Sequence, residues 1–325
     1  MRRIVITEAI KKLSEAYARE LLTAKGRYMT PEQGLNDLIN HIPKKYPKLI
    51  AYTEMIKNNL EDIVLLLPSQ FDSWYTKLDQ WKNDTRYREA LSKMIRYNKK
   101  RKEFYKHLVD VMRYDRVQSH IMPFYIEHLD IRTCVYCNAQ YAISTEKIAS
   151  RKYAHYELDH FKPKSRYPFL CVSFFNLQPS CANCNKHKSN KDSLFGLYTD
   201  SPADVEVFSF NLKPTSVIDY VHNFDCEKLE IEFKALSNDA LRKNHEERFY
   251  ISKLYPRFKK EASEILWLKK AYSPAFMKQI SEGFEAVFPN GIPDVETLFW
   301  GHDMRPEDVH KRPLNKLVQD LKKSL

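Results

Sequence analysis

The sequence predicts an α+β protein that is mostly helical and is interrupted near its middle by a short segment of different character. Helical periodicity dominates residues 1–125 and returns near Asn238. Between about 126 and 200, short apolar runs, turn residues and clustered Cys, His and Asn replace that period. Two segments, 204–212 and 228–236, then alternate with period two and predict paired strands, as a hairpin or a meander. We therefore expect a helical region over 1–125, a central domain over 126–200, and a β-hairpin followed by helices over 201–325.

The N-terminal region contains one helix with clear boundary signals. In the stretch TPEQGLNDLINHI, Thr30 is placed to act as N-cap, Pro31 occupies the first helical position and Gln33 completes a capping box. The apolar residues that follow recur at helical spacing: Leu35, Leu38 and Ile39. A second, longer helix with basic faces is predicted over 85–114. Its run Asn98–Lys102 could contact phosphates, although a solvated helix face is the better interpretation of such a run.

Composition limits the class of protein. The chain has 325 residues, 43% of them hydrophobic and 29% charged, as in soluble globular proteins. Its net charge of +11 favours an anionic partner such as nucleic acid, although a basic surface without a partner has the same composition. No apolar run approaches the roughly 20 residues that span a membrane, and charged residues interrupt the N-terminal segment, so we expect a cytoplasmic protein.

Two C-x2-C pairs, Cys134–Cys137 and Cys181–Cys184, frame the central segment. Thiols stay reduced in the cytoplasm, where paired cysteines bind metal more often than they form disulfides. The pairs supply the four thiolates that a structural, tetrahedral Zn²⁺ prefers, and we predict such a site. Buried thiols without a metal are the alternative. Cys171 and Cys226 lack such spacing and are expected to be core thiols.

Inside this frame the chain places an acid beside a histidine, Asp159-His160, followed by Asn176 and by Asn185 directly after Cys184. This order and spacing, with the two cysteine knuckles, resemble the HNH endonuclease family over residues 130–192. The resemblance implies a zinc-stapled ββα-metal unit. It also implies that His160 is the general base, that Asp159 and Asn185 bind the catalytic metal, and that Asn176 orients the base.

The chemistry of these residues agrees with those roles. A histidine with an ordinary pKa near 6.5 accepts a proton from water at neutral pH. Carboxylate and amide oxygens suit Mg²⁺ or Mn²⁺, and two protein ligands leave positions for water and phosphate. Neighbouring residues of a strand face opposite sides, so Asp159 and His160 can serve one site only if the strand ends there, and Pro163 supplies that end.

Two details of the site remain open. His187 lies two residues after Asn185 and is the alternative metal ligand, with Asn185 favoured because it directly follows Cys184. Basic residues ring the motif, and we expect them to neutralise backbone phosphates. They are Lys162, Lys164, Arg166, Lys186, Lys188 and Lys191.

Within the family, ELDHFKPKSRYPF and SFFNLQPSCANCNKHK look most like PtuB-like HNH subunits of anti-phage systems of the Septu and retron type. That resemblance implies a DNA endonuclease that acts in bacterial defence with an ABC-type ATPase partner. DNA is the favoured substrate. An RNA-cleaving effector is one alternative, because the metal and the base act on a phosphate that both polymers share, and a zinc-stapled binding module with an idle site is the alternative from another class. Oligomeric state is not predicted.

Overall fold

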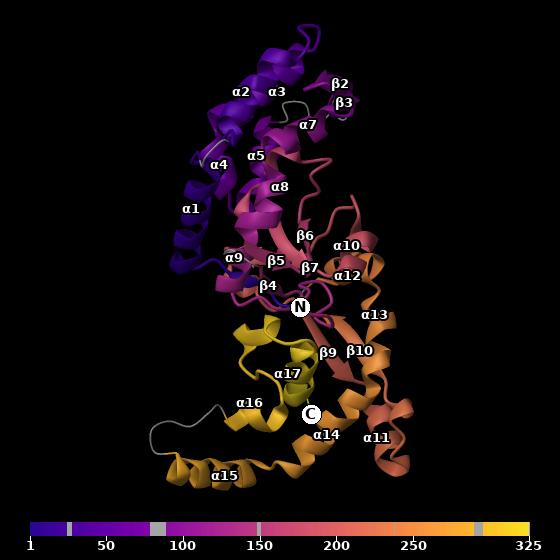
Figure 1. Ribbon diagram of the computed structural model, residues 1–325. Coiled ribbons are helices and arrows are strands. Elements are labelled where there is room, and N and C mark those ends of the chain that lie inside the picture. Colours follow the sequence, from indigo (N-terminus) through magenta and orange to yellow (C-terminus); the bar gives the residue numbers. More distant parts are fainter. Residues whose placement is uncertain (25–27, 79–88, 148–150, 237, 289–294, 325) are drawn as a thin grey trace. The chain divides into compact units, whose positions relative to one another are not determined.

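The computed structural model describes all residues except 25–27, 79–88, 148–150, 237, 289–294 and 325 (Figure 1). The chain forms two compact units. The first, called here the N-terminal unit, comprises Arg3–Leu129 and Ala142–Val205. The second, the C-terminal unit, comprises Met1–Arg2, Asp130–Tyr141 and Glu206–Leu325. The division predicted from the sequence, with boundaries near 125 and 200, stays a prediction.

Helices dominate both units, and the strands of the described residues form small two-stranded sheets. This confirms the predicted α+β class. The helices of the N-terminal unit are α1 (Glu8–Leu22), α2 (Pro31–His41), α3 (Pro47–Asn58), α4 (Leu60–Leu65), α5 (Phe71–Leu78), α7 (Phe104–Val111), α8 (Tyr114–Arg116), α9 (Met122–His128) and α10 (Ala182–Lys188). Its strands are β1 (Ile4–Val5), β2 (Met94–Tyr97), β3 (Lys100–Glu103), β4 (Ser144–Lys147), β5 (Arg151–Ala154), β6 (Glu157–His160), β7 (Leu177–Ser180) and β8 (Tyr198–Thr199).

Local signals determine α2 as predicted. The Thr30 hydroxyl accepts a hydrogen bond from the Gln33 N–H at 3.2 Å, and the Gln33 side chain accepts one from the Thr30 N–H at 2.9 Å. Leu35 and Leu38 are fully buried. Gly34 lets α2 approach α7 closely, since a Cβ at this position would lie 2.9 Å from the carbonyl oxygen of Val111.

The predicted helix over 85–114 is wrong for most of its length. Residues 85–88 lie outside the described residues, and 94–103 form the antiparallel β2–β3 hairpin. Among the described residues of this stretch, α-helix is limited to 89–91, 104–111 and the start of 114–116. Ile95 and Tyr97 alternate with exposed residues and point into the unit, which is a strand pattern. The turn residues Asn98 and Lys99 both have positive φ, as a tight hairpin requires and a helix forbids.

In the C-terminal unit the two predicted strands are present and pair. β9 (Phe208–Leu212) and β10 (Ile231–Ala235) are antiparallel, with Phe210 opposite Phe233. A helix, α11 (Pro214–Asn223), connects them, so they are neither a tight hairpin nor a meander. The remaining helices are α12 (Asp239–Phe249), α13 (Ile251–Leu254), α14 (Lys259–Ala271), α15 (Pro274–Val287), α16 (Val295–Trp300) and α17 (Asn315–Ser324).

Aromatic packing forms the core of the C-terminal unit. Phe210 stacks on Tyr255 with ring centroids 4.0 Å apart, and Leu317 and Leu321 of α17 are fully buried. The buried carboxylate of Asp320 accepts a hydrogen bond from the Phe210 N–H at 2.9 Å, which ties α17 to β9. Among the described residues, no helix is long and apolar enough to cross a membrane.

Candidate active site

The predicted catalytic residues lie around the antiparallel β6–β7 pair. Asp159 and His160 are on β6, Asn176 directly precedes β7, and Asn185 is on α10, which packs against β6 (Figure 1). Asp159 and His160 are the last two residues of β6, opposite Gln178 and Leu177 of β7. The strand ends at His160, as Pro163 predicts. Both side chains can therefore contribute to one cavity, although they are neighbours in sequence.

The imidazole of His160 is held in one orientation. Its Nε2 lies 3.0 Å from the carbonyl oxygen of Cys171, and because a carbonyl only accepts, Nε2 carries the proton. Its ring packs on that of Tyr114, with centroids 4.7 Å apart. Burial, reinforced by the positive charges of Lys164 and Lys188, lowers the pKa of His160 to about 3. The ring is therefore neutral at physiological pH, with Nδ1 unprotonated and able to accept a proton, but it is a weaker base than the histidine of ordinary pKa expected from the sequence.

Asn176 holds the backbone beyond His160 rather than the imidazole ring. Its Oδ1 accepts a hydrogen bond from the Lys162 N–H at 2.7 Å. Its Nδ2 donates to the carbonyl oxygens of Lys162 at 3.2 Å and Leu170 at 2.9 Å. The side chain is fully buried. Asn176 therefore contacts the backbone near His160, whereas the carbonyl oxygen of Cys171 contacts the imidazole ring.

A cavity of about 470 Å³ brings together three of the four residues predicted for the catalytic site, and Asn176 is not among its lining residues. Asp159, His160 and Asn185 all line it, with Glu157, Lys164 and Lys186 among its other residues. Asn185 lies half-buried on the first turns of α10, whereas His187 is exposed and does not line this cavity. The oxygen donors of Asp159 and Asn185 fit a hard divalent ion such as Mg²⁺ or Mn²⁺.

One of the predicted phosphate-binding lysines has a different environment. Lys188 is completely buried, and its Nζ lies 3.0 Å from Oδ2 of Asp159 and 2.6 Å from the carbonyl oxygen of His160. An ammonium enclosed in this way does not contact a backbone phosphate, so the assignment of Lys188 to nucleic-acid binding is wrong. Lys188 lies on the face of α10 that packs against β6. Its burial therefore follows from the tertiary packing and could not be predicted from the sequence.

The other predicted cations divide into two groups. Lys162 pairs with Asp72 at 3.1 Å and Arg166 pairs with Asp192, so part of their charge is already neutralised. Lys186 and Lys191 are exposed, and Lys164 lies with its Nζ 4.1 Å from the centroid of the Tyr114 ring, at the wall of the cavity. Burial lowers the pKa of Lys164. These three are the members of the set best placed to meet a phosphate.

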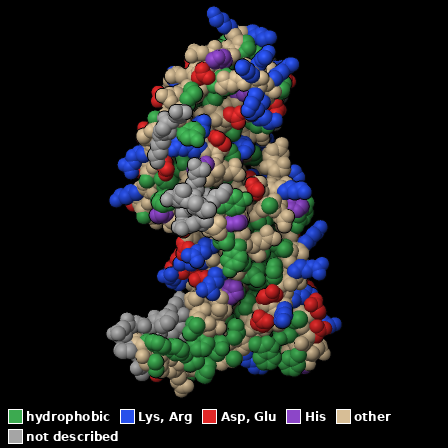
Figure 2. All heavy atoms as spheres, in the orientation of Figure 1, with side chains coloured by type: hydrophobic (Ala, Val, Ile, Leu, Met, Phe, Trp, Pro, Cys, Tyr) green, Lys and Arg blue, Asp and Glu red, His purple; other side chains and the backbone are tan. Residues whose placement is uncertain are grey.

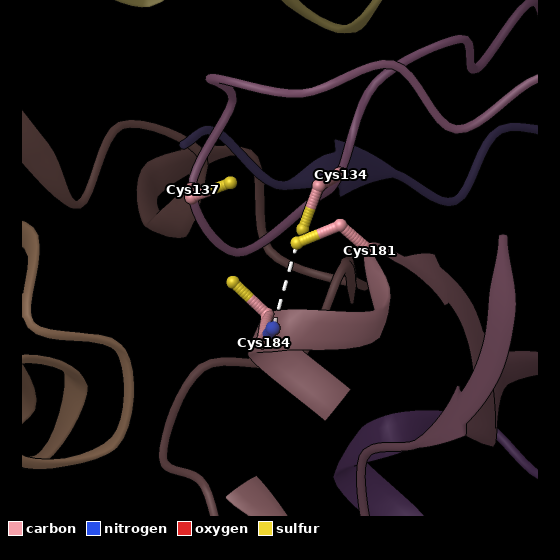
Figure 3. Close-up of side chains that lie close together, drawn as sticks. All are labelled: Cys134, Cys137, Cys181 and Cys184. Atoms are coloured by element: carbon pink, nitrogen blue, oxygen red, sulfur yellow. Dashed lines mark hydrogen bonds between the residues drawn. The ribbon is translucent and has the colours of Figure 1, made fainter. Parts of the chain in front are cut away.

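The four paired cysteines form a buried cluster. The Sγ atoms of Cys134, Cys137, Cys181 and Cys184 all lie within 4.8 Å of one another, and Figure 3 shows them turned toward one shared space. None of them is in a disulfide. A compact set of four cysteine sulfurs is the donor set that structural Zn²⁺ prefers, so this cluster could hold zinc. Cys171 is a buried thiol outside the cluster, as predicted, whereas Cys226 is only half-buried.

Sequence reasoning missed the residues that support these groups from a distance. Tyr114 packs on His160 and donates its hydroxyl to the carbonyl oxygen of Leu158 at 2.7 Å. In the C-terminal unit, Asn138 donates to the Val309 carbonyl oxygen at 2.8 Å, and His245 lies 2.8 Å from that of Tyr136. The residues of these three pairs are 44, 171 and 109 positions apart in sequence, so no local sequence pattern predicts the contacts.

The comparisons with known proteins are sparse. The chain is 29% identical to "Septu protein PtuB" of Bacillus thuringiensis over 106 residues, which are 30% of this chain and 38% of that protein. The chain thus matches well under half of that relative's length. No protein-family model matches the chain, and no solved structure matches it. What the comparisons establish is a partial similarity between this chain and a Septu protein.

Proposed function

We propose that this chain is a metal-dependent endonuclease of the HNH type that hydrolyses phosphodiester bonds of DNA as an effector of bacterial anti-phage defence. The observation that carries the proposal is the environment of His160. A neutral imidazole, with Nε2 committed to the Cys171 carbonyl oxygen, lines the same cavity as the oxygen donors of Asp159 and Asn185.

The reaction needs a base, a cation and charge compensation. Nδ1 of His160 accepts the proton of a water molecule, whose oxygen attacks the phosphorus while the bond to the 3′-oxygen breaks. The leaving 3′-oxygen takes a proton from a solvent water molecule, so that a 5′-phosphate and a 3′-hydroxyl result. A divalent ion held by Asp159 and Asn185 would offset the negative charge that builds on the phosphate oxygens and the leaving oxygen. Lys164 and Lys186, on the wall of the cavity, add positive charge for the substrate's flanking phosphates.

The setting in defence rests on the similarity to a Septu protein, supported by the motifs in the sequence. Systems of this kind pair the nuclease with a second protein, and we propose an ABC-type ATPase for that partner. The zinc proposed for the cysteine cluster has a structural task, because its four ligands leave no open position for a substrate.

Cleavage of supercoiled plasmid tests the proposal. Wild type, His160→Ala and His160→Gln are compared with Mg²⁺, with Mn²⁺ and without added divalent ion, alone and with the protein encoded beside it. The glutamine side chain in His160→Gln keeps an amide donor for the Cys171 carbonyl oxygen but cannot accept the proton. His187→Ala, which changes an exposed histidine on α10, is the matched control.

We expect metal-dependent nicking by wild type and His187→Ala and none by either His160 variant. Total RNA is incubated in parallel. Cleavage of RNA alone would retain the site and change the substrate, which contradicts the DNA assignment. Equal cleavage by wild type and both His160 variants would show that the base lies elsewhere. No cleavage of either polymer, with or without the partner, would favour an idle binding module.

A further inference from the structure

The β2–β3 hairpin presents a dense group of exposed positive charges. Arg96, Lys99, Lys100 and Arg101 are all exposed, and they lie within six consecutive residues at the closed end of the hairpin. Figure 2 shows Lys and Arg side chains gathered over the region where Figure 1 labels β2 and β3. We call these four residues the hairpin cations. The proposed nuclease mechanism uses none of them.

The arrangement of the hairpin cations is unfavourable for the isolated chain. Arg96 and Arg101 face each other directly across the two strands, and like charges in that position destabilise a hairpin. Within the part of the chain that the structure describes, no acidic side chain pairs with any of the four. The adjacent Lys102, by contrast, pairs with Asp110 at 2.6 Å. The repulsion at the tip is therefore left for an external anion to relieve.

The turn of the hairpin also carries a charged residue at a position where another residue would be more stable. Asn98 has φ of 48° and Lys99 has φ of 62°, so both lie in the left-handed region. Asn-Gly is the favoured pair for such a two-residue turn, because glycine adopts positive φ without a steric cost. A lysine stands at the position where glycine would be most stable, and it places an ammonium at the very tip.

Residues of α2 and α7 contact the buried face of the hairpin. Ile95 and Tyr97 are buried on its inner face, and the Tyr97 hydroxyl donates to Asp37 of α2 at 2.5 Å. The ring of His107 on α7 lies with Nε2 2.9 Å from the Ile95 carbonyl oxygen. The hairpin cations are therefore presented on a supported scaffold, so less order has to be imposed when an anion binds.

From these observations we infer that the β2–β3 hairpin is a DNA-binding element, whose hairpin cations contact the phosphates that border the major groove of double-stranded DNA. A two-stranded β-ribbon fits that groove, and Arg and Lys at its exposed tip meet phosphates on either side. Contacts of this kind give affinity without reading the sequence. This surface goes beyond the proposed function, since it concerns binding and lies outside the catalytic cavity.

Binding of a short DNA duplex tests the inference, measured by fluorescence anisotropy on the full chain as a function of salt. Every protein carries His160→Gln and no divalent ion is added, so that no strand is cut. The test variant combines Arg96→Gln, Lys99→Gln, Lys100→Gln and Arg101→Gln. The control removes the same number of exposed charges from the C-terminal unit, at Lys228, Lys253, Arg257 and Lys260.

The inference predicts by how much the salt dependence of DNA binding should change. Each phosphate contact contributes about 0.9 to the slope of log K against log salt, so the test variant should lose about 3 to 4 from that slope and bind at least about tenfold more weakly. The control variant should retain the slope of the parent. Equal salt slopes in the parent and the test variant would overturn the inference. This would hold even if the four substitutions abolished binding to an acidic protein, because the inference names DNA as the ligand.

A single substitution separates binding from folding. Lys99→Gly removes one charge and places glycine where φ is positive, so it should raise the melting temperature while lowering the salt slope by about 1. Weaker binding together with greater stability cannot be explained by unfolding. An unchanged slope in this variant counts against the inference. DNA binding that depends on the hairpin without any nuclease activity would leave this inference standing and the proposed function refuted.

Discussion

The ammonium of Lys188 lies 3.0 Å from Oδ2 of Asp159, and the lysine side chain is completely buried. The same Nζ donates to the His160 carbonyl oxygen at 2.6 Å. Transfer of a carboxylate or an ammonium from water to the protein interior costs free energy. The attraction between the two buried charges offsets part of that cost. One lysine of α10 thus neutralises the proposed metal ligand and anchors the backbone of the proposed base. A divalent ion that binds Asp159 must share its carboxylate with Lys188.

This relationship predicts how Lys188→Met behaves. Removing the ammonium takes the compensating positive charge away from the buried Asp159 carboxylate, which should lower the free energy of unfolding by about 3–5 kcal/mol in the absence of divalent ions. Mn²⁺ should restore part of that loss, because it supplies the missing positive charge. Thermal melting with increasing Mn²⁺ measures this, and the shift should be larger in Lys188→Met than in wild type. Lys186→Met, exposed on the same helix, is the control. The same Mn²⁺ shift in all three proteins would contradict the coupling.

Asn176→Ala should disorganise the segment that follows the proposed base. The substitution removes three hydrogen bonds and leaves the Lys162 N–H and two carbonyl oxygens without their partner. We expect the free energy of unfolding to fall by about 3 kcal/mol, since unsatisfied buried polar groups are expensive. Denaturant unfolding measures the loss. Asn190→Ala, which changes an exposed asparagine at the cavity of the proposed site, should leave stability within about 0.5 kcal/mol of wild type. A similar loss in both variants would argue against this function for Asn176.

The cysteine cluster predicts a zinc content that one substitution abolishes. Sγ of Cys181 also caps α10 by accepting the Cys184 N–H at 3.4 Å, and a serine hydroxyl can replace that cap (Figure 3). Cys181→Ser therefore tests the metal ligand with little effect on the cap. Atomic emission after dialysis should find about one zinc per chain in wild type and close to none in the variant. Cys226→Ser should keep its zinc. Equal zinc in wild type and Cys181→Ser would exclude the cluster as the site.

Buried histidines should make the protein sensitive to mild acid. Burial lowers the pKa of His310 to about 4, and its Nε2 donates to the Arg2 carbonyl oxygen at 2.8 Å. Between the unfolded pKa near 6.5 and about 4, the unfolded chain takes up a proton that the folded chain does not. Stability is therefore fully present above 6.5 and falls as the pH drops toward 4, by on the order of 3 kcal/mol from this residue.

The test is a comparison of unfolding at neutral and acidic pH. His310→Gln keeps a donor for the Arg2 carbonyl oxygen and cannot titrate, so its stability should depend less steeply on pH than that of wild type. His222→Gln, which changes an exposed histidine of the same unit, should retain the wild-type slope. A slope in His310→Gln as steep as that of wild type would contradict the expectation.

The sequence predicted elements well wherever a local signal is sufficient. The capping box at Thr30 and Gln33, the strand end at His160 and the return of helix near Asn238 all follow from residues within a few positions of one another. Asp159, His160 and Asn185 were likewise predicted to share a site, and they line one cavity. The helix over 85–114 failed for the converse reason. Its apolar residues allow a helical reading, but Ile95 and Tyr97 become buried only against α2 and α7.

The sequence by itself therefore determined the α+β class, the paired cysteines and the residue types of the proposed site, because these depend on periodicity, spacing and side-chain chemistry. Only the tertiary structure decided that Lys188 pairs with Asp159, that the Cys171 carbonyl oxygen holds His160, and that a basic run becomes an exposed hairpin. Each of these relationships joins residues that are distant in the chain or depends on which face is buried. Burial changes the energy of a charge far more than its sequence neighbours do, and burial is a property of the folded molecule.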